Sequence, residues 1–206
     1  MDQIIQKYFQ LTTHQKDKIC LMFDVYAEWN EKVNLISRKD FPYFYERHIL
    51  HSLAIAKCFS FNKGSHILDL GSGGGFPGIP LAIQFPQVHF SLVDSIRKKT
   101  DALKSIVNKL SLNNVTVIHN RAEDITNTFD FVICRAVARL NILDSWTQVL
   151  ISSKSNHKFK NGLICLKGGD LSDEIKGFEH RIQVFDISDF FQEDFFSEKK
   201  IIHLKK

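Results

Sequence analysis

A glycine-rich segment between an apolar run and an expected helix is the part of this chain best suited to chemistry. It spans residues 67–78, and an acid, Asp69, stands two residues before its first glycine. Glycines let a backbone take positive φ and approach a ligand closely, and Pro77 suits the start of a helix. The pattern predicts a strand, a nucleotide-binding loop and a helix whose N-terminus faces the ligand.

The glycines alone do not decide which nucleotide binds. Gly73, Gly75 and Gly78 form a G-x-G-x-x-G pattern, which dinucleotide-binding proteins also carry. The Asp69 carboxylate would repel a pyrophosphate, whereas it would attract the ammonium group of a methionine moiety, directly or through water. We therefore expect S-adenosylmethionine as the cofactor, bound over Gly71 and Gly73. A NAD-dependent dehydrogenase is an alternative.

A second acid, Asp94, ends the apolar stretch 88–94. At the end of the second strand, a carboxylate can accept both ribose hydroxyls of a nucleoside. NAD and S-adenosylmethionine would both be served by such a contact. Asp94 therefore indicates a nucleoside site without choosing the cofactor.

A third loop follows the predicted strand 114–119. It contains Ala122, Glu123 and Asp124 and is suited to hydrogen-bonding an adenine edge. Taken singly, Asp94 and these acids can be ordinary turn or helix-cap residues. Because all of them follow predicted strands, at the edge where open α/β sheets bind ligands, we favour a cofactor site.

Alternating strands and helices are expected from residue 65 onward. The other expected elements are a helix at 95–110, strands at 129–134 and 163–167, and strand-like tail segments at 181–187 and 200–204. This order predicts an α/β, Rossmann-like class I methyltransferase fold. Its doubly wound sheet is mostly parallel and seven-stranded, with an antiparallel edge strand.

The first sixty residues are expected to be helical. Thr12 and Gln15 have capping-box spacing, and Asp40 with Pro42 would begin a second helix. One helical face carries the apolar residues Ile19, Met22, Phe23, Tyr26 and Trp29. We expect an N-terminal helical extension, residues 1–62, packed on a methyltransferase domain, residues 63–206.

Length and composition allow one substantial core with a small appendage. The chain has 206 residues, of which 44% are hydrophobic, and no stretch approaches the length of a membrane span. The start, Met1-Asp2-Gln3, lacks a basic region followed by an apolar run, so we expect a cytoplasmic protein without membrane contact. The four cysteines show no C-x-x-C spacing, which predicts neither a metal site nor a disulfide framework.

Positive charge is clustered, although the net charge is only +4. Clusters lie at residues 97–99, 154–160, 199–200 and 205–206. Such clusters favour a polyanionic partner, and a solvated lysine-rich surface is the alternative for any one of them.

The residues after the fourth expected strand indicate what the substrate is not. Arg135 and Arg139 stand where amino-group methyltransferases carry an Asp/Asn-Pro-Pro-aromatic signature, which this chain lacks. Methylation of an exocyclic amine is therefore disfavoured. Cys134 could be a nucleophile for carbon methylation, but a cysteine on a buried strand is more often inert core.

Several motifs together resemble the glucose-inhibited division protein B family. They are the loop from Asp69 to Ala82, Leu92-Val93-Asp94-Ser95, Arg121-Ala122-Glu123, Arg135-Ala136, Leu166-Lys167-Gly168, Trp29-Asn30, Asn34-Leu35 and Arg47-His48-Ile49-Leu50. The resemblance spans nearly the whole chain. It implies a bacterial enzyme that uses S-adenosylmethionine to methylate N7 of one guanine in small-subunit (16S) ribosomal RNA. It also implies cofactor contacts at Gly71, Phe76, the Ala122-Glu123 backbone and Arg135.

Two positions depart from the family pattern. The family usually has an aspartate where this chain has His51, and an arginine where it has Lys199. The first change puts a helix contact in doubt. The second replaces a forked phosphate donor by a point charge, which keeps the electrostatics but weakens the geometry.

The chemistry implied by the resemblance needs no general base, because guanine N7 already exposes a lone pair. Catalysis would rest on positioning by Arg135, Arg139 and Lys167. We expect Arg135 to contact the cofactor carboxylate or guanine O6.

Phosphates or the base edge would be held by Arg121, Arg139, Lys167 and Lys199. For Arg139 and Lys167, a surface salt bridge is the alternative. The expected partner is small-subunit ribosomal RNA or a ribosomal particle, and the protein is expected to be a monomer. A methyltransferase acting on another RNA or a small molecule, and a non-catalytic RNA-binding module, remain alternatives.

Overall fold

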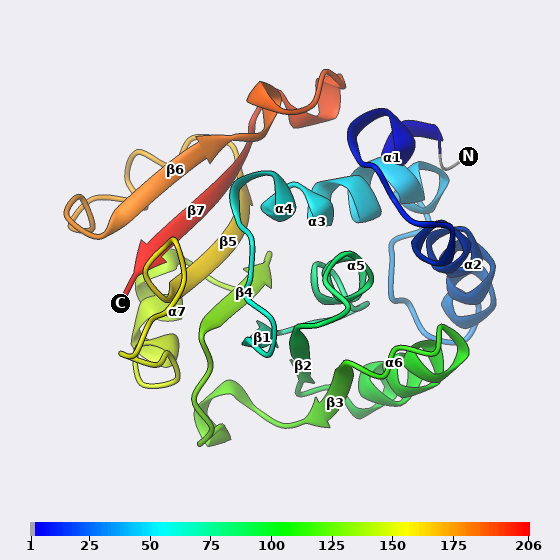
Figure 1. Ribbon diagram of the computed structural model, residues 1–206, viewed down its shortest axis with the longest axis horizontal. Coiled ribbons are helices and arrows are strands. Elements are labelled where there is room, and N and C mark those ends of the chain that lie inside the picture. The colour runs from blue at the N-terminus through cyan, green and yellow to red at the C-terminus, as the bar shows by residue number, and fades with distance from the viewer. Residues whose placement is uncertain (1–2) are drawn as a thin grey trace.

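Seven apolar stretches of the chain pair into one sheet in the order β3-β2-β1-β4-β5-β7-β6 (Figure 1). The computed structural model describes residues 3–206. Met1 and Asp2, the first two residues of the expected 1–62 extension, lie outside the described residues. The strands are β1 (His66–Leu70), β2 (His89–Asp94), β3 (Val115–His119), β4 (Phe131–Arg135), β5 (Gly162–Gly168), β6 (Ile182–Asp186) and β7 (Lys199–Lys205).

The first five strands are parallel, and the two C-terminal strands are added antiparallel. β7 inserts between β5 and β6, so β6 forms the edge of the sheet. The strand order reverses between β1 and β4, which is the switch point where open α/β sheets bind ligands. The mostly parallel, seven-stranded sheet with an antiparallel edge is thereby confirmed.

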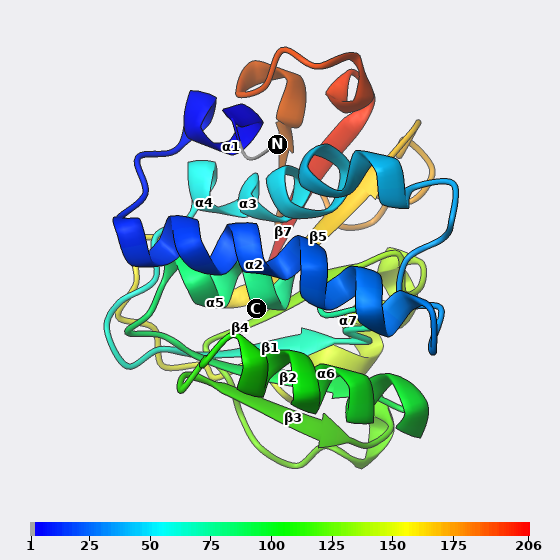
Figure 2. The same ribbon diagram turned by 90° about the vertical axis from the view of Figure 1, so that its right-hand side faces the viewer.

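Helices cover both faces of the sheet. They are α1 (Gln3–Tyr8), α2 (Thr13–Asn30), α3 (His51–Leu53), α4 (Ile55–Cys58), α5 (Gly78–Gln84), α6 (Arg97–Lys109) and α7 (Leu140–Thr147), with short 3-10 turns η1 (Phe41–Tyr43), η3 (Ala122–Asp124), η4 (Ile187–Asp189) and η5 (Asp194–Phe196) and a π-helix, η2 (Phe44–Leu50). One face carries α2, α5 and α6 with the N-terminal helices, and α7 lies on the other (Figures 1 and 2). The chain-order alternation of strands and helices therefore gives a three-layer arrangement.

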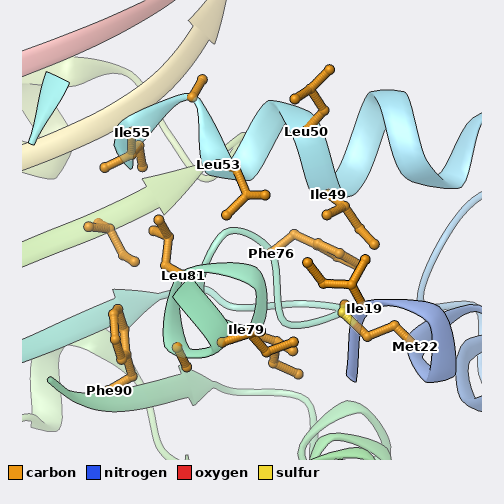
Figure 3. Close-up of a cluster of buried hydrophobic side chains, with 14 of the residues drawn as sticks. Ile19, Met22, Ile49, Leu50, Leu53, Ile55, Phe76, Ile79, Leu81 and Phe90 are labelled. Carbon is orange, nitrogen blue, oxygen red and sulfur yellow. The ribbon is translucent and has the colours of Figure 1, made fainter. Parts of the chain in front are cut away.

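The N-terminal helices share one apolar core with the sheet. Ile19 and Met22 of α2 approach the α5 helix from one side, while Ile49 and Leu53 approach it from another (Figure 3). All four side chains are at most 1% exposed. The predicted capping box is confirmed, since the Thr12 side chain accepts from the Gln15 backbone and the Gln15 side chain accepts from the Thr12 backbone.

The second N-terminal helical segment begins after Asp40, with Pro42 in its first turn, as expected, but the Asp40 side chain does not cap it. The Asp40 carboxylate instead accepts from the Ser37 hydroxyl at 2.7 Å and from the Arg47 guanidinium at 3.0 Å, and it makes no cap bond. A 3-10 turn, η1, is followed by the π-helix η2, which carries Arg47 and His48. Short π-helical turns occur frequently at functional sites. The apolar periodicity of the sequence does not predict this π-helix.

Candidate functional site

The glycine loop leaves β1 in a conformation that only glycine adopts without strain. Gly71, Gly73 and Gly75 have φ values of 65°, 56° and 85°. A Cβ atom at Gly71 would also lie 2.8 Å from a methyl carbon of Val137, which packs over the loop. The expected strand, loop and helix are confirmed, with α5 beginning at Gly78.

The N-terminal helices fix this loop from outside. The Tyr26 hydroxyl of α2, fully buried, donates a 2.6 Å hydrogen bond to the carbonyl oxygen of Gly74. On the same glycine, a Cβ atom would lie 2.9 Å from the carbonyl oxygen of Leu35. Residues of the expected extension therefore hold the turn of the glycine loop.

Asp69 lies beneath the loop and is fully buried. Its Oδ2 accepts a 2.9 Å hydrogen bond from the Gly78 backbone N–H at the start of α5, and its Oδ1 has no partner among the described residues. Burial raises the pKa of this carboxyl to about 7, against the opposing influence of the Gly78 bond and of Arg135. One oxygen thus fixes the helix start, while the other is left to pair with a cation or a water molecule.

Asp94 closes the loop on the ligand side. Its Oδ2 accepts from the Gly73 N–H at 2.8 Å, and its Oδ1 accepts from the Ile96 N–H at 2.8 Å. A carboxylate has about four acceptor positions, so each oxygen keeps a free lone pair. Asp94 is therefore held rigidly without being saturated.

A pocket of about 210 Å³ opens beside Asp94, and we call it the β1–β3 pocket. Its lining comes from the carboxyl ends of β1 and β2, the segments that follow β1, β3 and β4, and α7, and it includes Gly71, Asp94, Arg121, Ala122, Glu123, Val137 and Trp146. The structure therefore brings together the glycine loop, the acid after β2 and the loop after β3, as the sequence predicts.

A second pocket, of about 310 Å³, lies on the β5 side of β4, and we call it the β4–β5 pocket. Arg135, at the end of β4, lines it. Ala136 follows with φ at +55°, a left-handed conformation that strains a residue with a side chain. After this turn Val137 lines the first pocket, so the segment 135–137 separates the two.

Cations dominate the lining of the β4–β5 pocket. Arg47, Arg135, Lys167 and Lys199 contribute to it, and Asp40 is the acid among its lining residues. A pocket with this charge balance attracts anionic groups.

Arg135 faces the β4–β5 pocket without a carboxylate partner among residues 3–206. Its guanidinium donates to the Arg47 carbonyl oxygen at 3.1 Å and contacts His48 Nδ1 at 3.0 Å, and it lies 5.2 Å from the centre of the Phe76 ring. Burial lowers the pKa of Arg135 to about 10, which leaves it charged at neutral pH. Burial and the nearby Arg135 lower the pKa of His48 to about 3, so this imidazole is neutral. The neutral ring can thus accept from Arg135 and hold it in place.

The family of the chain follows from comparison with known sequences. The family described as rRNA small subunit methyltransferase G (GidB) matches residues 15–202. This chain belongs to that family. It is 48% identical over 202 residues to the ribosomal RNA small subunit methyltransferase G of Bacteroides thetaiotaomicron, covering 98% of each chain. It is 44% identical over 203 residues to the protein of the same name from Cytophaga hutchinsonii, again covering 98% of each.

Solved structures confirm the fold class. The chain is similar to precorrin-6y C5,15-methyltransferase from Geobacter metallireducens, with a TM-score of 0.55 and 13% identity over 76% of this chain and 88% of that one. It is also similar to M. jannaschii TYW2 in complex with AdoMet, with a TM-score of 0.55 and 15% identity over 73% and 72% of the chains. The sheet is thus that of the Rossmann-like methyltransferases.

Two side chains that the family resemblance assigns to the cofactor do not line the β1–β3 pocket. Phe76 is 3% exposed and packs on the rings of Tyr26 and His48, both at 5.1 Å. Arg135 faces the other pocket. The cofactor contacts expected of Phe76 and Arg135 stay predictions.

The cations expected to hold RNA fall into three settings. Lys167 Nζ donates to Glu174 at 2.6 Å and to the Ala138 carbonyl oxygen at 2.7 Å, so its charge is already engaged. Arg139 lines a separate groove in which Glu174 and two further acids also stand. Arg121 is exposed at the β1–β3 pocket. Lys199 lines the β4–β5 pocket, and its ammonium makes no hydrogen bond or ion pair with a described residue. Lys199 is therefore the best placed of the four to meet a phosphate in the β4–β5 pocket.

Some residues of the two pockets were not singled out from the sequence. They include Arg47 and His48, which the family motif contains but to which no role was given, and Phe195 and Trp146. A pair of basic residues inside an otherwise apolar helical stretch was the available signal for Arg47 and His48. His51 is 6% exposed against the rings of Phe195 and Phe196, and burial holds its pKa well below the usual range.

The structure assigns Cys134 to the core. Its Sγ lies 3.3 Å from Cys165 Sγ, and both side chains are at most 1% exposed. This contact together with burial holds the pKa of the Cys134 thiol well above its usual range, which disfavours a nucleophilic thiolate. Across residues 3–206, no three potential ligands among His, Cys, Asp and Glu gather where they could hold a metal ion, and no helix is long and apolar enough to cross a bilayer.

Proposed function

We propose that this chain transfers the methyl group of S-adenosylmethionine to N7 of a guanine in small-subunit ribosomal RNA. The observation that carries the proposal is the pair of pockets on either side of the segment 135–137. One offers an acid and backbone groups suited to a nucleoside, and the other offers cations suited to a nucleic acid. The printed names of the relatives, ribosomal RNA small subunit methyltransferase G, support the substrate.

The residues of the β1–β3 pocket fit the cofactor. The free lone pairs of Asp94 would accept the ribose hydroxyls, and the backbone at Ala122 and Glu123 would meet the adenine edge. Asp69 lies beneath the glycine loop and does not line this pocket, but its buried Oδ1, which has no partner among the described residues, would match an ammonium group directly or through water. Arg135, a cation without an ion pair, would hold the cofactor carboxylate or guanine O6.

When bound, the cofactor would supply an electrophilic methyl group on a positively charged sulfur. Guanine N7 carries an exposed lone pair and loses no proton when it is methylated, so the chain need not supply a general base. Its residues have to hold the base in line and keep cations away from N7, since a cation there would oppose the developing positive charge. Arg135 would hold the base edge or the cofactor carboxylate without moving onto N7, because Arg47 and His48 fix the direction of its guanidinium.

RNA is a better match to the β4–β5 pocket than a small neutral substrate. The cations Arg47 and Lys199 line it together with Arg135 and the engaged Lys167. Phosphate contacts of this kind supply affinity and orientation for a nucleic acid without selecting its sequence. A methyltransferase acting on a small neutral molecule would have no need of them.

The proposal is tested by incubating the purified chain with methyl-labelled S-adenosylmethionine and, separately, free small-subunit RNA, the isolated subunit and the intact ribosome. The RNA is then digested to nucleosides and the label is identified by chromatography. We expect label in 7-methylguanosine. Label in another nucleoside, or none with any of the three substrates, would refute the proposal.

A further inference from the structure

Four side chains form an alternating row of cations and aromatic rings at the mouth of the β4–β5 pocket. The Arg47 guanidinium carbon lies 3.8 Å from the centre of the Tyr43 ring and 5.3 Å from that of Phe195. The Lys199 ammonium lies 5.0 Å from the centre of the Phe195 ring. We call these four residues, Tyr43, Arg47, Phe195 and Lys199, the cation–aromatic rim.

The rim runs from the pocket to the surface. Arg47, Phe195 and Lys199 line the pocket, whereas Tyr43 lies beyond Arg47 and is 47% exposed. Asp40 holds the Arg47 guanidinium at 3.0 Å, which fixes the cation against the Tyr43 ring. The Arg47 guanidinium therefore lies over one face of the Tyr43 ring, and nearly half of this residue is open to solvent.

Folding alone does not account for this row. Tyr43 and Arg47 belong to η1 and the π-helix η2, while Phe195 and Lys199 come from η5 and β7, about 150 residues away in the chain. The segment between β6 and β7, orange to red, lies above the cyan helices in both views (Figures 1 and 2). An exposed aromatic ring and an unpaired ammonium contribute little to the core, so their alignment at a pocket mouth points to a ligand.

We propose that the cation–aromatic rim binds the nucleotide adjacent to the methylated guanine in single-stranded RNA. Its base stacks on the open face of Tyr43, and the phosphate between the two nucleotides is held by Lys199. Single-stranded RNA is recognised by splayed bases that stack on aromatic rings and arginine planes, with cations tracking the backbone. An acidic peptide would use the two cations but leave the flat ring faces unused. The inference rests on the proposed function, because the pocket must receive a base of RNA.

The test compares Tyr43→Ala with Tyr43→Phe, which keeps the ring, and with Val149→Ala, a change at a surface residue that is 75% exposed and outside both pockets. For each, the Kd for small-subunit RNA is measured by filter binding, the Kd for S-adenosylmethionine by calorimetry, and KM and kcat by methyl transfer. Stacking of one base is lost in Tyr43→Ala, so its RNA Kd and KM should rise roughly tenfold. The cofactor Kd and kcat should not change, and the Phe and Val149 variants should match the parent chain.

A photo-crosslinking phenylalanine analogue at position 43 then identifies what touches the rim. Crosslinking to an RNA base next to the labelled guanine is the expected result. Unchanged RNA Kd in Tyr43→Ala, equal loss in Tyr43→Phe, or crosslinking to a ribosomal protein would each overturn the proposal. Because RNA binding is measured apart from methyl transfer, a parent chain that bound RNA through the rim yet formed no 7-methylguanosine would refute the proposed function and the position next to a methylated guanine, while stacking of an RNA base on Tyr43 would stand.

Discussion

Asp69 gives the most quantitative prediction, because its buried carboxyl has a pKa raised to about 7. If the cofactor ammonium pairs with Oδ1, it binds the ionised form, and protonation of Asp69 must compete with binding. The apparent Kd is then multiplied by one plus the ratio of protonated to ionised carboxyl. With a pKa of about 7, the Kd for S-adenosylmethionine should be about eightfold higher at pH 6 than at pH 7.5.

The matched variant is Asp69→Asn, which keeps an oxygen for the Gly78 N–H and removes the titration. Its cofactor Kd should exceed that of the parent at pH 7.5 and should not vary between the two pH values. Calorimetry at both pH values measures all four constants. A flat profile in the parent chain, or the same pH dependence in Asp69→Asn, would refute the pairing of Asp69 with the ammonium.

The same pKa predicts a dependence of folding stability on pH. The carboxyl is raised above its unfolded value of 3.8, so the folded chain holds this proton more tightly than the unfolded chain between pH 4 and pH 7. The stabilisation that this proton gives the folded chain is complete below the unfolded pKa and is lost as pH rises through the folded pKa. Between the two pKa values, the free energy of unfolding falls by about 1.4 kcal/mol for each pH unit. In urea unfolding of the unliganded chain, the parent should lose stability relative to Asp69→Asn from pH 4 to pH 7. A constant difference between the two chains would contradict the raised pKa.

Four further changes test other parts of the site. Asp94→Ala should raise the cofactor Kd roughly 10- to 100-fold in calorimetry, because hydrogen bonds to a charged group are lost; an unchanged Kd would move the ribose elsewhere. Gly71→Ala should weaken cofactor binding and lower the melting temperature, since its Cβ would meet Val137 at positive φ; full binding would show that the loop can relax. Lys199→Gln should reduce the slope of log RNA affinity against log salt by about one, with cofactor affinity intact. Lys167→Ala should chiefly lower the melting temperature, because its ammonium is engaged with a carboxylate; a larger loss of salt slope than in Lys199→Gln would reverse these roles.

Local signals in the sequence predicted the fold because each depends only on residues that are close together in the chain. The capping box at Thr12, the glycine loop and the apolar strands depend on short-range geometry, and all are confirmed. The acid after β2 and the loop after β3 were brought to one pocket because parallel strands end at the same edge of a sheet. The β1–β3 pocket was therefore accessible from the sequence.

The substrate side was less accessible because it is built from long-range contacts. The direction of Arg135 depends on Arg47 and His48, which lie 88 and 87 residues away in the chain, and on a π-helix that has no sequence signature. The Lys167 ammonium, which the family motif had made a candidate for RNA binding, is already paired with Glu174 and is not a free cation. Pairing between side chains on different elements decides which charges remain available, and a single sequence does not report it.

The central claim is that a cofactor in the β1–β3 pocket directs its methyl group across the turn at Ala136 into the β4–β5 pocket. A crystal structure of the chain with S-adenosylhomocysteine, the demethylated product, tests it most directly. We expect the ribose on Asp94, the adenine at Ala122 and Glu123, and the sulfur facing the pocket lined by Arg135. A nucleoside bound elsewhere, or a sulfur turned away from that pocket, would contradict the account.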